Sequence, residues 1–388
     1  AIDLYSINKQ GHFSGKNVLY LSRSLVDYAK HKSLSINKLV HDVQTINTRL
    51  VEIRQQRMTP FIDKKILTSW NALMIQSLVI ASDQFGDSTY LDAAQKAANF
   101  IWANRDIKNQ QLWRIHLHGR NSVPAQQEDY AYYAAALLKI YDATGDRLWL
   151  ERAQIITKTM LALFWDTKQG GLFMNSENTR DSLMIQPKSS KDNEISSGNA
   201  VAMQVFSELS KRVSNPEYMQ KSNQLLAAFS SQFVATPLDY SYFLLAASDF
   251  LYGEQGAVQY AANGAVKISA RRVLLKKQQW LEIDIDIRPE WHINAHKPLQ
   301  NYLIPTAIRL APNNNTWHLG RVDYPAPVRK KLNLQNETLA LYTRKIMIKA
   351  PISKTLNEDS SLSVIVKLQA CTDQVCLAPE EIKVLPIR

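Results

Sequence analysis

Two cysteines near the end of the chain are the residues whose type and spacing most readily support chemistry. Cys371 and Cys376 are the only cysteines among 388 residues. They follow a strand-like run, and a turn between them brings the two Cα atoms within the roughly 4.4 to 6.8 Å that a disulfide tolerates. Closing so short a loop stabilises the chain only modestly. Exposure on a turn favours thiolate formation and exchange, but a structural disulfide and two free thiols remain open alternatives.

Aromatic, carboxylate and amide side chains gather at the starts of three predicted helices. In a ring of helical hairpins such starts converge on a central cavity. A sugar site uses this combination, because aromatic rings stack on the sugar while Asp, Glu and Asn hydrogen-bond its hydroxyls, and a carboxylate can act as general acid or base. The alternative is that these residues cap helices and fill the core. The candidate ligand-binding residues, including one further tryptophan, are Trp70, Asn71, Glu128, Asp129, Tyr130, Trp165, Ser197 and Asn199.

The histidines do not form a convincing metal site. His116 and His118 lie two positions apart on a strand-like segment, but no third ligand is evident near them. His292 and His296 are also close in sequence, and residues 291–294 are typical of the end of a strand. We therefore predict neither a metal ion nor an organic cofactor.

The elements that would position these residues are helical over about the first two thirds of the chain. From about residue 36 to residue 252 apolar residues recur at helical spacing. The phrase at residues 85–94 is echoed at 144–153 and more loosely at 214–219, an interval of about 60 to 70 residues. That interval accommodates two helices and a long loop. The sequence therefore predicts an array of helical hairpins.

The pattern changes after residues 252–256. Apolar residues then alternate with polar ones, as in residues 280–287 and 361–368, with Pro and Asn between the runs. About eight such runs are typical of an all-β sandwich. We therefore expect a multidomain protein in which a helical-hairpin domain, residues 1–255, is followed by a sandwich, residues 256–388.

Charge and composition exclude several classes of protein. Residues 257–388 carry 19 Lys and Arg against 11 Asp and Glu, so most of the net charge of +11 lies there. The basic residues are scattered along strands without interleaved aromatic residues, which argues against nucleic-acid binding. No apolar run approaches the roughly 18 residues of a membrane helix. The first residues contain neither an initiator Met nor a signal-peptide pattern, so we expect a processed or truncated chain.

The helical part resembles the second half of the YyaL-type family, thioredoxin-domain proteins related to the spermatogenesis-associated proteins. Residues 11–19, 63–74, 128–131 and 196–200 carry the resemblance. It implies an (α/α)6 toroid similar to N-acylglucosamine 2-epimerases, with a cavity for a carbohydrate-like ligand. The chain departs from the family in having no thioredoxin-like domain and only about four hairpins. We therefore expect an incomplete, open arc.

Residues 265–388 resemble the amino-terminal periplasmic domain of the thiol:disulfide interchange protein DsbD, an immunoglobulin-like sandwich. The resemblance rests on residues 290–293, 305–306, 324–327, 341–342, 369–371 and 376–380. It implies that Cys371 and Cys376 form a reversible disulfide that passes electrons between thioredoxin-like partners, and it implies a periplasmic or otherwise extracytoplasmic location. Two features depart from the family: the cysteine spacing is shorter by one, and residues 332–336, where an aromatic cap would lie, contain no Phe or Tyr.

These observations lead to one principal hypothesis and two alternatives. The principal one is an extracytoplasmic thiol:disulfide oxidoreductase that exchanges electrons through Cys371 and Cys376 with a thioredoxin-like protein or domain, while the helical part binds a ligand or partner. The first alternative is a carbohydrate-binding or carbohydrate-active toroid that uses the sandwich as an accessory module. The second is a structural role for both the disulfide and the helical arc.

Overall fold

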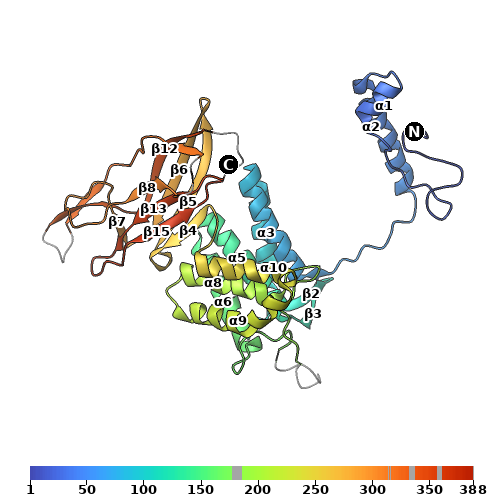
Figure 1. Ribbon diagram of the computed structural model, residues 1–388. Coiled ribbons are helices and arrows are strands. Elements are labelled where there is room, and N and C mark those ends of the chain that lie inside the picture. Colours follow the sequence, from blue (N-terminus) through green and yellow to red (C-terminus); the bar gives the residue numbers. More distant parts are fainter. Residues whose placement is uncertain (177–185, 313, 315, 332–336, 356–360, 388) are drawn as a thin grey trace. The chain divides into compact units, whose positions relative to one another are not determined.

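The computed structural model describes residues 1–176, 186–312, 314, 316–331, 337–355 and 361–387 (Figure 1). It divides into two compact units, residues 1–64 and 65–388. The first unit contains α1 (Leu25–His31) and α2 (Ile36–Gln55). The division falls inside the expected first domain. It lies in residues 58–65, which form neither helix nor strand and are exposed. The expected boundary at 255/256 stays a prediction, although the change from helix to strand lies beside it.

The helical part of the second unit is built from hairpins. α3 packs against α5, α5 against α8, and α8 against α10, while α4, α6 and α9 each return along the helix before them. The described residues of this unit thus contain three hairpins and the further helix α10, where a closed toroid has six hairpins. The helices are α3 (Thr68–Phe85), α4 (Ser88–Ala103), α5 (Gln127–Thr144), α6 (Arg147–Phe164), α8 (Gly198–Arg212), α9 (Pro216–Ala235) and α10 (Ser241–Tyr252).

The repeated phrase of the sequence forms the corners of these hairpins. Gly86 and Gly145 end α3 and α5 in the left-handed conformation, with φ of 68° and 71°, which glycine adopts without steric cost. Asp87 then accepts a hydrogen bond from the backbone N–H of Thr89 and caps α4. Asp146 and Asn215 cap α6 and α9 in the same way. The repeat is therefore a helix stop followed by a helix start.

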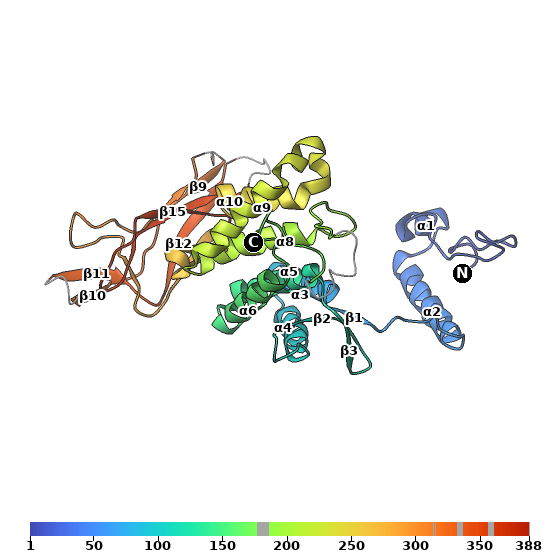
Figure 2. The same ribbon diagram turned by 90° about the horizontal axis from the view of Figure 1, so that it is seen from below.

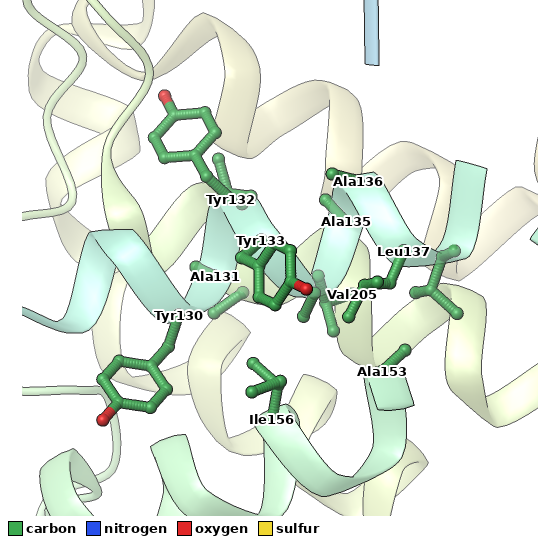
Figure 3. Packing of buried hydrophobic residues seen from close by; sticks show 14 of the residues in the cluster. Tyr130, Ala131, Tyr132, Tyr133, Ala135, Ala136, Leu137, Ala153, Ile156 and Val205 are labelled. Carbon is green, nitrogen blue, oxygen red and sulfur yellow. The ribbon is translucent and has the colours of Figure 1, made fainter. Parts of the chain in front are cut away.

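The core of the helical part is centred on α5, which is buried on nearly all sides. Small residues, among them Ala131, let α6 and α8 approach closely (Figure 3). The phenol of Tyr133 donates to the carbonyl of Ala98 at 2.7 Å, and that of Tyr132 donates to the carbonyl of Ser196. The tyrosines thus fill volume and satisfy carbonyl groups of neighbouring segments.

A small sheet lies beside the helices. It has the order β1-β2-β3, formed by β1 (Ile66–Leu67), β2 (Trp113–Leu117) and β3 (Arg120–Pro124). β1 runs directly into α3, and β3 precedes α5 by two residues. The sheet therefore connects the starts of two inner helices.

The described residues of the C-terminal part form three antiparallel sheets. The predicted fold class of helical hairpins followed by an immunoglobulin-like sandwich is confirmed, and Figure 2 shows both the helices and the strands. In β6 the buried residues Leu281, Ile283, Ile285 and Ile287 occupy alternate positions, as the sequence pattern predicts. The largest sheet, in spatial order, comprises β4 (Val258–Ala261), β5 (Val266–Leu275), β6 (Gln278–Ile287), β12 (Lys345–Lys354) and β9 (Trp317–Leu319).

The other two sheets carry the cysteine segment and its support. One has the order β10 (Val328–Lys331), β11 (Thr338–Tyr342), β7 (His292–Asn294) and β14 (Ala370–Cys371). The other has the order β15 (Glu380–Val384), β13 (Val364–Leu368) and β8 (Ala307–Leu310). Since β13 runs almost directly into β14, the chain passes from one sheet to the next just before Cys371.

A buried charge network joins the helices to the sandwich. Arg212, at the end of α8, is 1% exposed and contacts Asp142 at 2.7 Å and Glu254 at 3.1 Å. From β4, Tyr260 donates to the same aspartate at 2.8 Å. Gly264 approaches so closely that a Cβ atom there would lie 2.1 Å from the carbonyl oxygen of Arg212. The two parts are therefore packed tightly at this point.

Candidate functional site

The two cysteines form a disulfide within a tight antiparallel turn. The S–S bond joins Cys371, on β14, to Cys376, and their Cα atoms are 4.0 Å apart, somewhat closer than the range expected from the sequence, because the two residues face each other across a tight turn. The backbone N–H of Thr372 donates to the carbonyl of Val375, and the N–H of Leu377 donates to the carbonyl of Ala370. The free-thiol alternative therefore does not describe this structure, which holds the cysteines in their oxidised state.

The two sulfur-bearing residues differ in exposure. Cys371 is 2% exposed, because it is the last residue of β14 and packs beside β7. Cys376 lies beyond the turn and is exposed, as is its neighbour Val375. A thiolate from another protein must approach a sulfur along the S–S axis. This difference makes Cys376 the accessible partner.

The sequence motif before the first cysteine stabilises the turn. Gln369 donates from its side-chain amide to the carbonyl of Leu377 at 3.1 Å. Its side-chain oxygen accepts from the amide of Asn294, 3.4 Å away, and Asn294 also donates to the carbonyl of Ile304. Gln369 therefore connects the segment after the disulfide to β7.

His292 lies directly opposite Cys371 in the pairing of β7 with β14. It is 4% exposed. Burial lowers the pKa of its imidazole, Asp373 opposes that change and Lys330 adds to it. Lys330 and Asp373 are 3.6 Å apart and largely exposed. The sequence identified residues 291–294 as a strand end, but only the strand pairing reveals that this histidine is next to the disulfide.

Residues 332–336, the segment in which the family resemblance would place an aromatic cap, lie outside the described residues. Another aromatic contact is present nearby in the sandwich. The ring of His296 stacks on Tyr324 with centroids 3.7 Å apart, and Tyr342 accepts from the backbone N–H of His296. These contacts fix the loop that follows β7.

In the helical part, Asp129 connects the starts of two inner helices. Its carboxylate accepts from the backbone N–H of Ser69, in the first turn of α3, at 3.0 Å, and from that of Gln126, the N-cap of α5, at 2.9 Å. Arg114 on β2 donates to it at 3.0 Å. Burial raises the pKa of the Asp129 carboxyl, and Arg114 opposes the rise. All of these contacts hold the scaffold in place.

Three other predicted residues are engaged with the backbone in the same way. The Tyr130 hydroxyl accepts from the N–H of Leu112 at 2.9 Å, and burial raises its pKa to about 12. Asn199 is fully buried and bonds both the N–H and the carbonyl of Leu172. Ser197 caps α8. Their capping and scaffolding contacts are those of the alternative interpretation, and their role toward a ligand stays a prediction.

The remaining predicted residues lie in different surroundings. Trp70 is 62% exposed, and Asn71 donates to the carbonyl of Leu67 one turn earlier. Glu128 forms an ion pair with Arg114 at 2.8 Å. Trp165 is half-buried at the end of α6. Whether these side chains act together toward a ligand stays a prediction.

Of the hollows in the helical part, two lie against the helices α5 and α6. One, of about 520 Å³, lies by α5 and α10 and is lined by residues that include Tyr132, Asp192 and Tyr242. The other, of about 1440 Å³, lies against α6 and α9 and contains Trp165, with Lys221 placed 4.1 Å over its ring. Trp165 is thus the predicted residue that lines the larger hollow.

Metal binding finds no support in the described ranges of the chain. There, no group of three or more His, Cys, Asp or Glu side chains is arranged to hold an ion. His116 instead bonds the side chain of Asn121 and packs edge-on against Phe100. Nor does any helix in these ranges combine the length and apolar character that a membrane crossing requires.

Comparison with known proteins identifies a family for the C-terminal part. Residues 261–386 match the family model of the N-terminal domain of the thiol:disulfide interchange protein DsbD. This segment contains both cysteines, Gln369 and His292. The sequence resemblance of the sandwich is therefore confirmed.

The chain is also similar to curated relatives. Human spermatogenesis-associated protein 20 is 26% identical over 242 residues, and its mouse counterpart is 27% identical over the same length. Each match covers 60% of this chain and 31% of the relative. The chain spans about a third of the length of the relatives it matches.

Solved structures give weaker likenesses. Cellobiose 2-epimerase from Spirochaeta thermophila is 16% identical with a TM-score of 0.40, covering 49% of this chain and 55% of that one. The reduced N-terminal domain of DsbD from Neisseria meningitidis is 13% identical with a TM-score of 0.22, covering 30% and 81%. Scores of this size carry no argument about activity.

Proposed function

We propose that the protein exchanges electrons with a thioredoxin-like protein or domain through the Cys371–Cys376 disulfide. The observation that carries the proposal is the disulfide itself, which lies in the segment matched by the DsbD N-terminal family model and presents one exposed partner, Cys376. A bond that closes so short a loop contributes little stability. Exchange therefore accounts for the pair better than a structural role.

The reaction proceeds in two steps. A thiolate of the reduced partner attacks the sulfur of Cys376, the S–S bond breaks, and Cys371 leaves as a thiolate, giving a mixed disulfide. The second thiol of the partner, as its thiolate, then attacks the partner's own sulfur and releases Cys376. Two electrons and two protons pass from the partner dithiol to the cysteine pair, and the partner becomes a disulfide.

An oxidising compartment suits this chemistry. Thiols are kept reduced in the cytosol, so a disulfide persists mainly in compartments outside it. We therefore place the exchange in the periplasm or another extracytoplasmic space, in keeping with the resemblance of the sandwich to a periplasmic domain.

Trapping of the mixed disulfide tests the proposal. A thioredoxin that lacks its second cysteine forms a stable adduct with a target sulfur, so incubation with the oxidised protein and peptide mapping by mass spectrometry identifies the attacked cysteine. We expect the adduct at Cys376. The Cys376→Ser variant serves as the control. It has no disulfide for the thioredoxin thiolate to attack, so it should give no adduct. No adduct with the unaltered protein would contradict the proposal.

A second candidate function is binding of a carbohydrate-like ligand in the hollow beside Trp165. An aromatic ring next to carboxylate and amide side chains suits a polyol, and Asp166, Gln154 and Asn215 line the same hollow. We expect a panel of sugars to quench tryptophan fluorescence in the unaltered protein and not in Trp165→Leu. A flat response across the panel would remove this candidate.

A further inference from the structure

A group able to accept a proton when the disulfide is reduced lies beside Cys371. His292 and Cys371 are directly opposite each other in the antiparallel pairing of β7 and β14. Residues so placed have Cβ atoms about 4.5 to 5.5 Å apart and side chains on the same face of the sheet. Both residues are buried, so water screens their interaction weakly. The imidazole is therefore a titratable neighbour of Cys371 on the same face of the sheet.

The other charged groups around His292 are few and placed toward solvent. Asp373 lies on the turn that follows β14, and Lys330 on β10 forms an ion pair with it. From β11, Tyr342 is paired with Ile293, the residue after the histidine, and so lies on the opposite face of the sheet. Among the described residues, none forms a hydrogen bond with a ring nitrogen of His292. The imidazole is thus free to change its protonation state.

We infer that His292 takes up a proton when the disulfide is reduced and holds Cys371 as the thiolate of an imidazolium–thiolate pair. This inference rests on the proposed exchange function. When the partner thiolate bonds to Cys376, the negative charge appears on Cys371, on the face of the sheet that also carries the imidazole. Of the two protons that the partner dithiol releases, one reaches Cys376 and the other His292. In the reverse reaction the Cys371 thiolate attacks Cys376 in the mixed disulfide and re-forms the S–S bond, the partner leaves as a thiolate, and the imidazolium gives up the proton that this thiolate takes.

The ionic pair has a consequence for rate. An opposite charge within about 4 to 6 Å moves a pKa by about one to three units toward the charged form. A thiol with a lower pKa leaves a disulfide faster. His292 therefore accelerates the breaking of the S–S bond by stabilising Cys371 as its leaving group, without contacting the partner that attacks Cys376.

Nuclear magnetic resonance titration of the His292 ring tests the inference directly. The titration is made on the unaltered protein, oxidised and then reduced with a phosphine that is not a thiol. We expect the proton affinity of His292 to rise at least about tenfold on reduction. The exposed His318, on β9, serves as the internal control and should not change. An equal affinity of His292 in the two states would overturn the inference.

Variants give a second, independent measurement. We expect His292→Gln to slow reduction by a thioredoxin by about tenfold at neutral pH, and His318→Gln to leave it unchanged. Circular dichroism establishes that each variant is folded. Because the titration uses a chemical reductant, it separates two failures. A coupled histidine in a protein that no thioredoxin reduces would overturn the exchange function, whereas rapid exchange with an uncoupled histidine would overturn this inference alone.

Discussion

Replacement of Arg212 by methionine should destabilise the second unit by about 3 to 5 kcal/mol. The guanidinium is 1% exposed, and it donates two hydrogen bonds to Asp142, at 3.0 and 2.7 Å, and two to Glu254, at 3.1 and 3.2 Å. Methionine fills much of the same volume but leaves two buried carboxylates without that cation. Removal of one member of a buried ion pair costs about 3 to 5 kcal/mol.

The loss should depend on pH in a defined direction. Burial opposes ionisation of both carboxyl groups, but Arg212 outweighs it and lowers the pKa of Asp142 and of Glu254. Groups with lowered pKa stabilise the folded state above their unfolded pKa, and that stability is lost as pH falls through the folded pKa. Without Arg212, burial raises both values. The deficit of the variant should therefore be largest near neutral pH and shrink as the pH approaches about 4.

Urea unfolding followed by circular dichroism and tryptophan fluorescence measures the effect, at about pH 7 and about pH 5. The matched control is Lys211→Met, since Lys211 is the adjacent residue and lies 3.7 Å from Glu254 with 27% of its side chain exposed. It should lose less than about 1 kcal/mol. A loss for Arg212→Met as small as the control, or equal at the two pH values, would refute the reasoning.

Two further predictions concern the scaffold. Asp129→Ala leaves two backbone N–H groups without their acceptor and should cost about 2 to 4 kcal/mol in urea unfolding, whereas Glu128→Ala should cost less than about 1; equal losses would contradict the scaffold role. In Gly264→Ala the new Cβ meets the backbone of Arg212, and the residue has φ of 79°. This variant should therefore lose about 1 to 3 kcal/mol more stability than Gly86→Ala, whose Cβ meets open space and which costs about 1 to 2 kcal/mol. A thermal scan that does not find Gly264→Ala the less stable of the two would contradict that close approach.

Local features of the fold could be predicted from the sequence because they depend on neighbouring residues. Gly145 and Asp146 end one helix and start the next through bonds within a few positions, so their recurrence revealed the hairpins. The alternation in residues 280–287 likewise predicted β6. The disulfide turn was within reach of sequence reasoning for the same reason, since Cys371 and Cys376 are close in the chain.

Contacts between distant segments could not be predicted in this way. The opposition of His292 to Cys371 depends on a strand pairing across 79 positions, and a periodic pattern does not encode which strands pair. Arg212 and Asp142 are separated by 70 positions. The carboxylate of Asp129 shows the same limit, because its sequence context suits a ligand site as well as it suits the two helix starts that it bonds.

The reduction potential of the Cys371–Cys376 pair tests the central claim most directly. The protein is equilibrated in glutathione buffers, its thiols are trapped, and the reduced fraction is counted by mass spectrometry. The exchange function predicts a potential between roughly −270 and −120 mV, the range of thioredoxin-like partners. A value below about −300 mV would identify a structural disulfide and contradict the claim.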